Sequence, residues 1–413
     1  MAAGPLWRRC PRWTVSRAGS NLREAERRFF GLGAAASPGR ASWKWWRADE
    51  VPNLQLKQKI LQRSTWASLS LVRQKCPTRS RRALHGDAKP KDPFALANKD
   101  LKSLYDDIKK ELFVSKEELK SLCHYYFDGK GKAIRPTIVI LMARALNIHG
   151  DRAGELLPGQ RAVAMVSEMI HTASLVHDDV IDGSDERRGK RTVNRLWGER
   201  KAILAGDFIL SAASAALARV GDVAVVKVLA QVIEDLVRGE FMQLGSKENE
   251  NERFEHYLDK SFKKTASLIA HSCKAVSILV SSDPDVHEIA FQYGRNVGIA
   301  FQLVDDVLDF TAGASQLGKP SAADLKLGLA TGPVLFACRQ FPELHAMIMR
   351  RFSSKGDVDR AWRYVIQSDG VRQTNFLARR YCQEAVRHVS RLRPSAERDA
   401  LVALAHMVLA RDK

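Results

Sequence analysis

Three aspartates, Asp178, Asp179 and Asp182, lie within five positions of an otherwise apolar stretch, "HTASLVHDDVIDGSDERRGKRT". Residues four apart share one face of a helix, so Asp178 and Asp182 should project side by side, flanked by Asp179. Carboxylates this close raise each other's pKa unless a cation neutralises them. Oxygen-only ligands suit a hard ion such as Mg²⁺, which also accepts water and phosphate oxygens. For one such cluster alone, an exposed acidic helix end is the alternative.

A second cluster repeats the pattern 127 positions later, where "FQLVDDVLDF" contains Asp305, Asp306 and Asp309. Apolar residues surround these acids, which would not be expected if the acids lay on a solvent-exposed helix face. Two such faces could oppose each other across a helical cavity and clamp a diphosphate through several Mg²⁺ ions. We therefore expect all six aspartates to be metal ligands and Mg²⁺ to be the cofactor.

Basic residues accompany both clusters, in loops and at helix starts. Arginine offers a planar fork that fits phosphate oxygens bidentately. Each of these side chains alone would be an ordinary surface charge, but their position beside the clusters favours a phosphate site. The residues are Lys132, Arg135, Arg187, Arg188, Lys264 and Lys319.

From about residue 93 the apolar pattern is helical almost throughout. "RAVAMVSEMIHTASLVHDDVID" predicts one long helix that ends near Gly183, and "VHEIAFQYGRNVGIAFQLVDDVLDF" predicts a second. No strand alternation and no short repeat is visible. Each aspartate cluster is followed by a Gly/Ser-bearing break. An all-α fold that presents the acids at helix ends is expected.

The first 90 residues form a basic leader with 19 Lys and Arg against 5 Asp and Glu, most of the formal net charge of +19. An Arg-rich, acid-poor segment is typical of a mitochondrial transit peptide. A basic arm that binds nucleic acid or anionic lipid is the alternative. We expect residues 1–90 to be a transit peptide and disordered leader, residues 91–413 to be the catalytic domain, and the mature protein to lie in the mitochondrial matrix.

Other features exclude several classes of protein. No apolar window reaches the ~18 uninterrupted residues of a membrane span. The six cysteines form no CxxC pair and have no metal-ligand spacing with histidine, which favours free thiols in a reducing compartment. No Ser/His/Asp or Cys/His set supplies a nucleophile.

Six segments, taken in order, resemble the trans-polyprenyl diphosphate synthases over about residues 93–413. They are "GKAIRP", "EMIHTASLVHDDVIDGSDERRGK", "GEFMQL", "KKTASL", "GIAFQLVDDVLDF" and "GKPSAADLKLG". Within that family the sequence is similar to the animal mitochondrial enzymes that make decaprenyl or solanesyl diphosphate for the ubiquinone side chain. The resemblance implies the isoprenoid synthase fold, a helical bundle around a central cavity. It also implies addition of isopentenyl diphosphate units to an allylic diphosphate by ionisation, condensation and elimination.

The resemblance assigns roles to individual residues. It places isopentenyl diphosphate on Lys132, Arg135, His171 and Arg188. It places the allylic diphosphate on Arg187, Lys264, Thr265, Gln302 and Lys319. The family pattern DLxxGKxTxP reads "DLKLGLATGP" here, so Leu329 replaces a frequent lysine and the phosphate contact of that lysine is in question.

Small side chains behind Asp178 predict a long product. At ~1.5 Å per residue, Ala173 and Ser174 lie ~6–7.5 Å below the metal ligands, with Ile170 deeper. Short-chain relatives tend to have an aromatic ring there, whereas these residues leave room for a deep tunnel. Close packing between helices is the alternative explanation for Ala173 and Ser174.

The resemblance further implies a hetero-oligomer with a second, related subunit. We expect no nucleic-acid partner and no transmembrane span, with peripheral membrane contact for product release. A shorter-chain geranylgeranyl diphosphate synthase and a non-catalytic regulatory subunit are alternatives. A terpene cyclase or head-to-head synthase is disfavoured by the second aspartate cluster.

Overall fold

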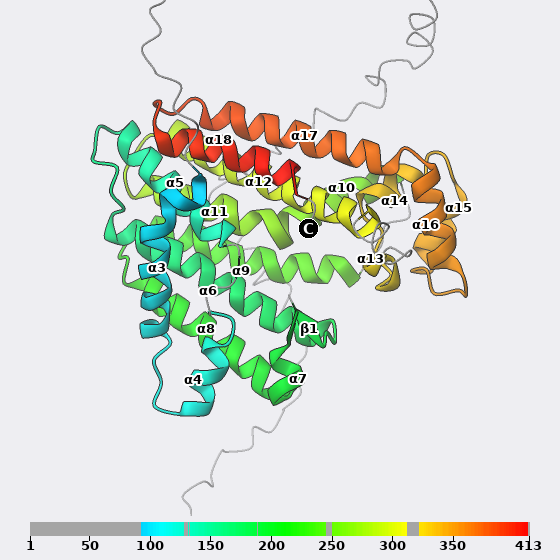
Figure 1. The fold of residues 1–413 in the computed structure, drawn as a ribbon, viewed down its shortest axis with the longest axis horizontal. Coiled ribbons are helices and arrows are strands. Elements are labelled where there is room, and N and C mark those ends of the chain that lie inside the picture. The colour runs from blue at the N-terminus through cyan, green and yellow to red at the C-terminus, as the bar shows by residue number, and fades with distance from the viewer. Residues whose placement is uncertain are drawn as a thin grey trace, which may run out of the picture. The chain divides into compact units, whose positions relative to one another are not determined.

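Helices joined by short loops make up the part of the chain that the computed structural model describes (Figure 1). Described are residues 92–411, except 128–130, 132, 188, 245–249 and 312–321. The leader and three expected phosphate-binding residues, Lys132, Arg188 and Lys319, lie outside the described residues.

The helices are, in chain order, α3 (Pro93–Glu111), α4 (Glu117–His124), α5 (Ile134–His149), α6 (Pro158–Ile181), α7 (Val193–Trp197), α8 (Glu199–Ala218), α9 (Val223–Leu244), α10 (Glu250–Ser261), α11 (Ser267–Ile278), α12 (Pro284–Thr311), α13 (Ala323–Lys326), α14 (Gly332–Ala337), α15 (Glu343–Met349), α16 (Asp357–Gln367), α17 (Gly370–Val389) and α18 (Ala396–Leu409). A π-helical turn, η2 (Phe262–Ala266), joins α10 to α11. A hairpin, β1 (Glu186–Arg187) and β2 (Lys190–Arg191), follows α6.

The two aspartate clusters lie at the carboxyl ends of the two longest helices, α6 and α12. Each helix starts with a proline, which suits a first turn because the amide hydrogens there have no partner within the helix. At the start of α6 the backbone N–H of Leu157 donates to Oε1 of Gln160 at 3.0 Å. The predicted long helix ending near Gly183 is confirmed, since α6 ends at Ile181.

Both cluster-bearing helices pack on α11. α6 packs on α8, α11 and α5, whereas α12 packs on α11, η2 and α17. In Figure 1, α17 runs along α12 and α18. Glycines allow the tightest contacts: a Cβ at Gly206 of α8 would lie 2.2 Å from Nε2 of His177 on α6. Tyr293, Met169 and Phe310 are among the large, fully buried side chains of the core.

The all-α expectation is confirmed, with two local features that the sequence pattern did not indicate. Each strand of the hairpin has only two residues, too few to show alternation, and Gly189 supplies its positive φ of 73°. The π-helical turn carries Lys264 and Thr265. Such turns add one residue to a helix and often occur at functional sites.

Two further expectations concern cysteines and membranes. Cys123, Cys273, Cys338 and Cys382 are buried free thiols, as expected, and burial raises the pKa of the Cys123 thiol to about 11. Among the described helices, α8 alone is long and apolar enough to cross a membrane by length and composition. It packs against α6 as a member of the bundle, although only 39% of its most apolar window is buried.

Candidate active site

The first aspartate cluster divides into two kinds of carboxylate. Burial raises the pKa of Asp178 to about 6 and also raises the pKa of Asp182, partly offset by the positive charge of Lys264. Within the described residues, no side-chain or backbone donor bonds to either carboxylate. These two groups therefore have oxygens available to a ligand, and desolvation makes an added cation favourable.

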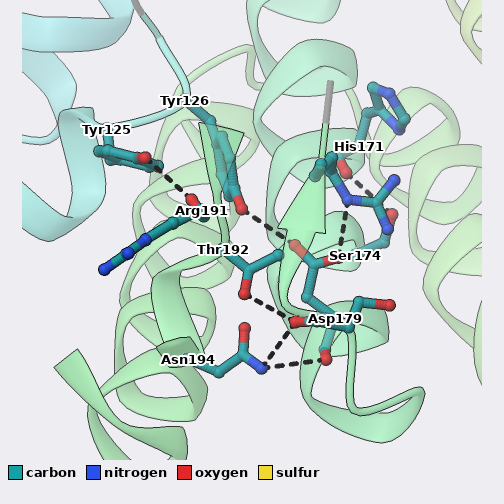
Figure 2. Close-up of polar contacts among 10 residues, drawn as sticks. Tyr125, Tyr126, His171, Ser174, Asp179, Arg191, Thr192 and Asn194 are labelled. Atoms are coloured by element: carbon teal, nitrogen blue, oxygen red, sulfur yellow. Dashed lines mark hydrogen bonds and ion pairs between the residues drawn. The ribbon is translucent and has the colours of Figure 1, made fainter. Parts of the chain in front are cut away.

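Asp179 is instead fixed on every side (Figure 2). It is 1% exposed, and its carboxylate accepts from the Tyr126 hydroxyl at 2.9 Å and from Nε of Arg187 at 2.8 Å. Nδ2 of Asn194 donates to its backbone carbonyl at 3.2 Å. Asp179 thus ties the hairpin that carries Arg187 to the end of α6, and holds that guanidinium near Asp178 and Asp182.

Asp306 has the same role in the second cluster. It is 2% exposed, and its carboxylate accepts from the Tyr257 hydroxyl and, at 2.8 Å, from Nε2 of Gln302. Burial raises the pKa of Asp306, whereas these two hydrogen bonds lower it. The described contacts occupy both oxygens.

The remaining acids of this cluster have different partners. Asp309 accepts from the backbone amides of Ala323 and Asp324 at 2.9 and 3.1 Å, which fixes the start of α13. Asp305 forms an ion pair with Arg411, whose Nη1 lies 2.8 Å from its Oδ1. Burial nonetheless raises the pKa of Asp305 to about 6.

The turn η2 connects the two clusters. Lys264 forms an ion pair with Glu240 of α9 at 2.6 Å and donates to Oε1 of Gln243 at 2.9 Å. Its charge also lowers the pKa of Asp178. The next residue, Thr265, donates its hydroxyl to Oε1 of Gln302 at 2.7 Å, and Gln302 in turn donates to Asp306. η2 therefore places the charge of Lys264 near the first cluster, and its next residue, Thr265, is hydrogen-bonded through Gln302 to the second.

Arg135 and His171, which the resemblance assigned to one substrate, contact each other. Nη1 of Arg135 lies 2.9 Å from Nε2 of His171, which joins the start of α5 to the middle of α6. The charge of Arg135 also lowers the pKa of Asp305. A second basic region, formed by Arg135 and His171, therefore lies near the second cluster.

Sequence reasoning missed several residues of the site. Tyr126 and Tyr257 hold the two buried aspartates, and Asp324 lies beside the second cluster. The pKa of Asp324 is raised to about 7 by burial and by the charges of Asp306 and Asp309. Asp324 is the first residue of the family pattern that reads "DLKLGLATGP" here, which was the available signal for it, whereas no spacing rule indicated the tyrosines.

The residues beside Asp178 and Asp305 fit a hard divalent cation by their chemistry. The donors are carboxylate oxygens in desolvated surroundings, next to basic groups that suit a diphosphate. Among the described residues, no three His, Cys, Asp or Glu side chains already converge on one point.

The expected chain-length residues fall on two faces of α6. Ser174 lies four residues before Asp178 and shares its face, and its hydroxyl donates to the carbonyl of His171 at 2.9 Å. Ala173 lies four residues before His177 and therefore on the face that meets α8. Ala173 and Ile170 are fully buried, whereas Ser174 is partly exposed.

Comparison with known proteins relates this geometry to a family. The polyprenyl synthetase family model matches residues 116–365. The mouse all trans-polyprenyl-diphosphate synthase PDSS1 is 62% identical over 410 residues, covering 98% of each chain. Decaprenyl-diphosphate synthase subunit 1 of Schizosaccharomyces pombe is 44% identical over 77% of this chain and 91% of its own length. The probable mitochondrial hexaprenyl pyrophosphate synthase of Neurospora crassa is 41% identical over 78% of this chain and 82% of its own.

The fold agrees with these relatives. A crystal structure of a polyprenyl synthase from Caulobacter crescentus, complexed with calcium and isoprenyl diphosphate, superposes with a TM-score of 0.69. It is 29% identical, and the match covers 80% of this chain and 100% of that one. The chain carries two aspartate-bearing helices with basic groups beside them. Because the family model and the relatives also match most of its length, the chain belongs to the polyprenyl synthetase family.

Proposed function

We propose that this chain condenses isopentenyl diphosphate units onto an allylic diphosphate to give decaprenyl or solanesyl diphosphate for the ubiquinone side chain. The chain is a long-chain trans-prenyltransferase, and its relatives do not favour the shorter-chain or non-catalytic alternatives. The observation that carries the proposal is that η2 serves both acid clusters: the charge of Lys264 lowers the pKa of Asp178, and Thr265 is linked through Gln302 to Asp306.

The assignment of ligands follows the two kinds of aspartate. Asp178 and Asp182 have carboxylate oxygens that are open to a divalent cation. Asp305 is paired only with Arg411. Asp179, Asp306 and Asp309 complete the six expected ligands, and in their present contacts they position Arg187, Gln302 and α13. We assign Mg²⁺ as the metal of this divalent-metal family. When bound, it would neutralise the diphosphate leaving group.

The reaction then follows from the placement of charge. Arg187 and Lys264 bind the allylic diphosphate, with Lys319 as a further contact, and stabilise the negative charge that it gains as its carbon–oxygen bond breaks. The electron pair of that bond leaves with the diphosphate, and an allylic cation remains. Thr265 and Gln302 face the reacting end of this substrate and hold it in position.

Isopentenyl diphosphate occupies the second basic region, on Arg135 and His171, together with Lys132 and Arg188. Its double bond attacks the allylic cation, a carbon–carbon bond forms, and the proton from C2 passes to the released diphosphate. Buried apolar side chains around both helices exclude water that would quench the cation. The growing tail extends along α6 past Ser174, Ala173 and Ile170.

An assay of diphosphate release, with and without Mg²⁺, tests this function together with chromatography of the products. We expect metal-dependent release and a product of nine or ten isoprene units. Absence of activity from the chain in any assembly would contradict the proposal.

A second, related subunit is the proposed partner. One relative is named as subunit 1 of its synthase. Several large apolar side chains on α8 and α9 are exposed, including Leu204 at 63% and Phe241 at 71%. Exposed apolar surface of this kind marks protein interfaces more often than solvated faces. Replacing Leu204 with Glu should weaken co-purification with that subunit; unchanged co-purification would exclude α8 from the interface.

The chain is a mitochondrial protein, like its named relative, and we propose the matrix as its compartment. The basic leader supplies the import signal and is removed. Deleting residues 1 to about 85 should leave an active core that no longer enters mitochondria. Unaided import of the truncated chain would show that the leader is not the signal.

A further inference from the structure

Arg411 follows α18 and reaches across to α12. Its Nη1 lies 2.8 Å from Oδ1 of Asp305, and its guanidinium carbon lies 4.0 Å from the ring centroid of Phe301. The arginine side chain is only 18% exposed. A guanidinium over an aromatic face is held by attraction to the ring, and more strongly where water is partly excluded.

The contact is specific but can be exchanged. Apart from Asp305, the ring of Phe301 is the one described group that holds the guanidinium. Nε and Nη1 of Arg411 are both buried without an aligned hydrogen bond among the described residues, so the 2.8 Å contact with Asp305 is an ion pair of poor hydrogen-bond geometry. Arg411 is therefore not locked in place by a bidentate ion pair, which would resist displacement.

A divalent cation needs the same carboxylate. Magnesium binds carboxylate oxygens at about 2.0–2.1 Å. A guanidinium nitrogen 2.8 Å from Oδ1 would repel a divalent cation bound to the same carboxylate, because like charges interact strongly in a partly desolvated site. Arg411 and a metal on Asp305 would therefore compete for this carboxylate.

The first cluster differs. Lys264 and Arg187, the described cations whose charges lower the pKa of Asp178, are paired with Glu240 and Asp179. Within the described residues, no cation contacts the carboxylate of Asp178. Replacement of a protein side-chain cation by a metal ion is therefore expected at the second cluster and not at Asp178.

We propose that Arg411 is a displaceable counter-ion of Asp305, which occupies this carboxylate in the metal-free protein and leaves when a divalent cation binds. The inference rests on the assignment of Asp305 as a metal ligand in the proposed function. Its consequence is a lower affinity of the second cluster for metal than the carboxylates alone would give.

Titration calorimetry with Mg²⁺ tests this directly on the full chain, in the assembly in which it purifies. The measurement is made near pH 8, well above the pKa of about 6 of Asp305, so that protons do not compete. Arg411→Gln should bind Mg²⁺ about three- to tenfold more tightly, the size expected for loss of one partly exposed competing ion pair.

Three further variants sharpen the result. Arg411→Lys keeps the charge and should retain the wild-type affinity within about twofold. Phe301→Leu removes the ring that holds the guanidinium and should tighten binding less than Arg411→Gln does. Arg393→Gln is the matched control, because it removes an arginine paired with Asp151 on the surface and should change nothing.

The outcomes separate this inference from the proposed function. Equal Mg²⁺ affinity in Asp305→Asn and wild type would overturn the assignment of Asp305 and, with it, the role of Arg411. If Asp305→Asn loses affinity while Arg411→Gln shows none of the expected gain, or a weakening, the counter-ion proposal alone is overturned.

Discussion

A Cβ at Gly298 would lie 2.5 Å from the Cα of Ala266, so α12 and η2 touch almost backbone to backbone at this point. One turn further along α12 is Gln302, which accepts from the Thr265 hydroxyl at 2.7 Å. The close contact made possible by glycine thus sets the distance over which Thr265 and Gln302 bond. Sequence alone gives Gly298 no such role.

Gly298→Ala should therefore impair catalysis by displacing η2 and its side chains, although it removes no functional group. The added methyl group forces η2 away from α12, which lengthens the bond between Thr265 and Gln302 and moves Lys264. We expect turnover to fall at least about tenfold, with a loss of stability of about 1–3 kcal/mol from overpacking. Gly150→Ala, whose nearest neighbour would be a carbonyl oxygen at 3.6 Å, is the control and should retain activity. Normal turnover in Gly298→Ala would show that this contact is not needed.

Tyr257→Phe should separate the support of Asp306 from the stability of the core. The variant removes a hydrogen bond to a buried carboxylate, worth about 1.5–3 kcal/mol. We expect weaker metal binding and roughly tenfold lower kcat/KM. The matched control is Tyr293→Phe, another buried tyrosine, whose hydroxyl donates to the carbonyl of Leu401 at 2.8 Å. The control should melt at a lower temperature yet keep its turnover, and a comparable loss of activity in both variants would argue against a specific role for Tyr257.

Asp178→Asn and Asp305→Asn should each lower turnover by orders of magnitude while the fold persists. Burial raises the pKa of both carboxyl groups to about 6, so removing either charge relieves a desolvation cost in the metal-free protein. Steady-state kinetics at saturating Mg²⁺ and thermal melts measure the two effects. Asp357→Asn provides the contrast: this buried acid pairs with Arg350, away from the site, and its loss should cost stability but not turnover. Near-normal turnover in either site variant would rule out its assignment.

The same raised pKa values predict the pH dependence of the metal-free protein. An aspartate titrates near 3.9 when unfolded but near 6 at Asp178 and Asp305, so the folded state binds more protons between these values. Their contribution to the free energy of unfolding is therefore present below about pH 4 and lost as the pH rises through about 6. Affinity for a divalent cation should rise over the same window. Urea unfolding of wild type and Asp178→Asn checks this, since the variant should lose less stability; identical pH profiles would contradict the raised pKa.

Product length tests the path of the tail. Ala173→Phe should stay active but stop after a few condensations, because a rigid ring cannot share volume with the tail. Ser174→Phe is the companion variant, since Ser174 shares the face of Asp178 whereas Ala173 faces α8. Chromatography of the dephosphorylated products separates the possibilities. Truncation by Ser174→Phe alone would place the tunnel on the Asp178 face, and full-length product from both active variants would refute a tunnel along this part of α6.

The long helices could be predicted from sequence because their apolar periodicity extends over more than twenty residues. The placement of acids at the ends of α6 and α12 followed from that pattern and is confirmed. The family resemblance assigned Arg135 and His171 to one substrate, and the structure has the two side chains 2.9 Å apart. The first result depends on a local apolar pattern, and the second depends on a sequence motif in which both residues can be identified.

The different roles within each aspartate cluster could not be predicted in this way. Asp178 and Asp179 are adjacent in sequence, yet Tyr126 and Arg187 hold only the second of them. Arg411 meets Asp305 from more than a hundred positions away. Contacts of this kind depend on tertiary packing, which leaves no spacing or periodicity in the sequence.

The π-helical turn also makes the site sensitive to the length of the chain. Tyr257 before the turn contacts Asp306, and Thr265 within it contacts Gln302, so one segment touches α12 twice. The extra residue of η2 determines how far the side chain of Thr265 is rotated about the helix axis relative to that of Tyr257. Deleting one residue between them would leave both side chains in the sequence but rotate one by about 100° relative to the other. A loss of a single codon here would therefore disable the enzyme more completely than most substitutions, while the flanking helices kept their apolar faces.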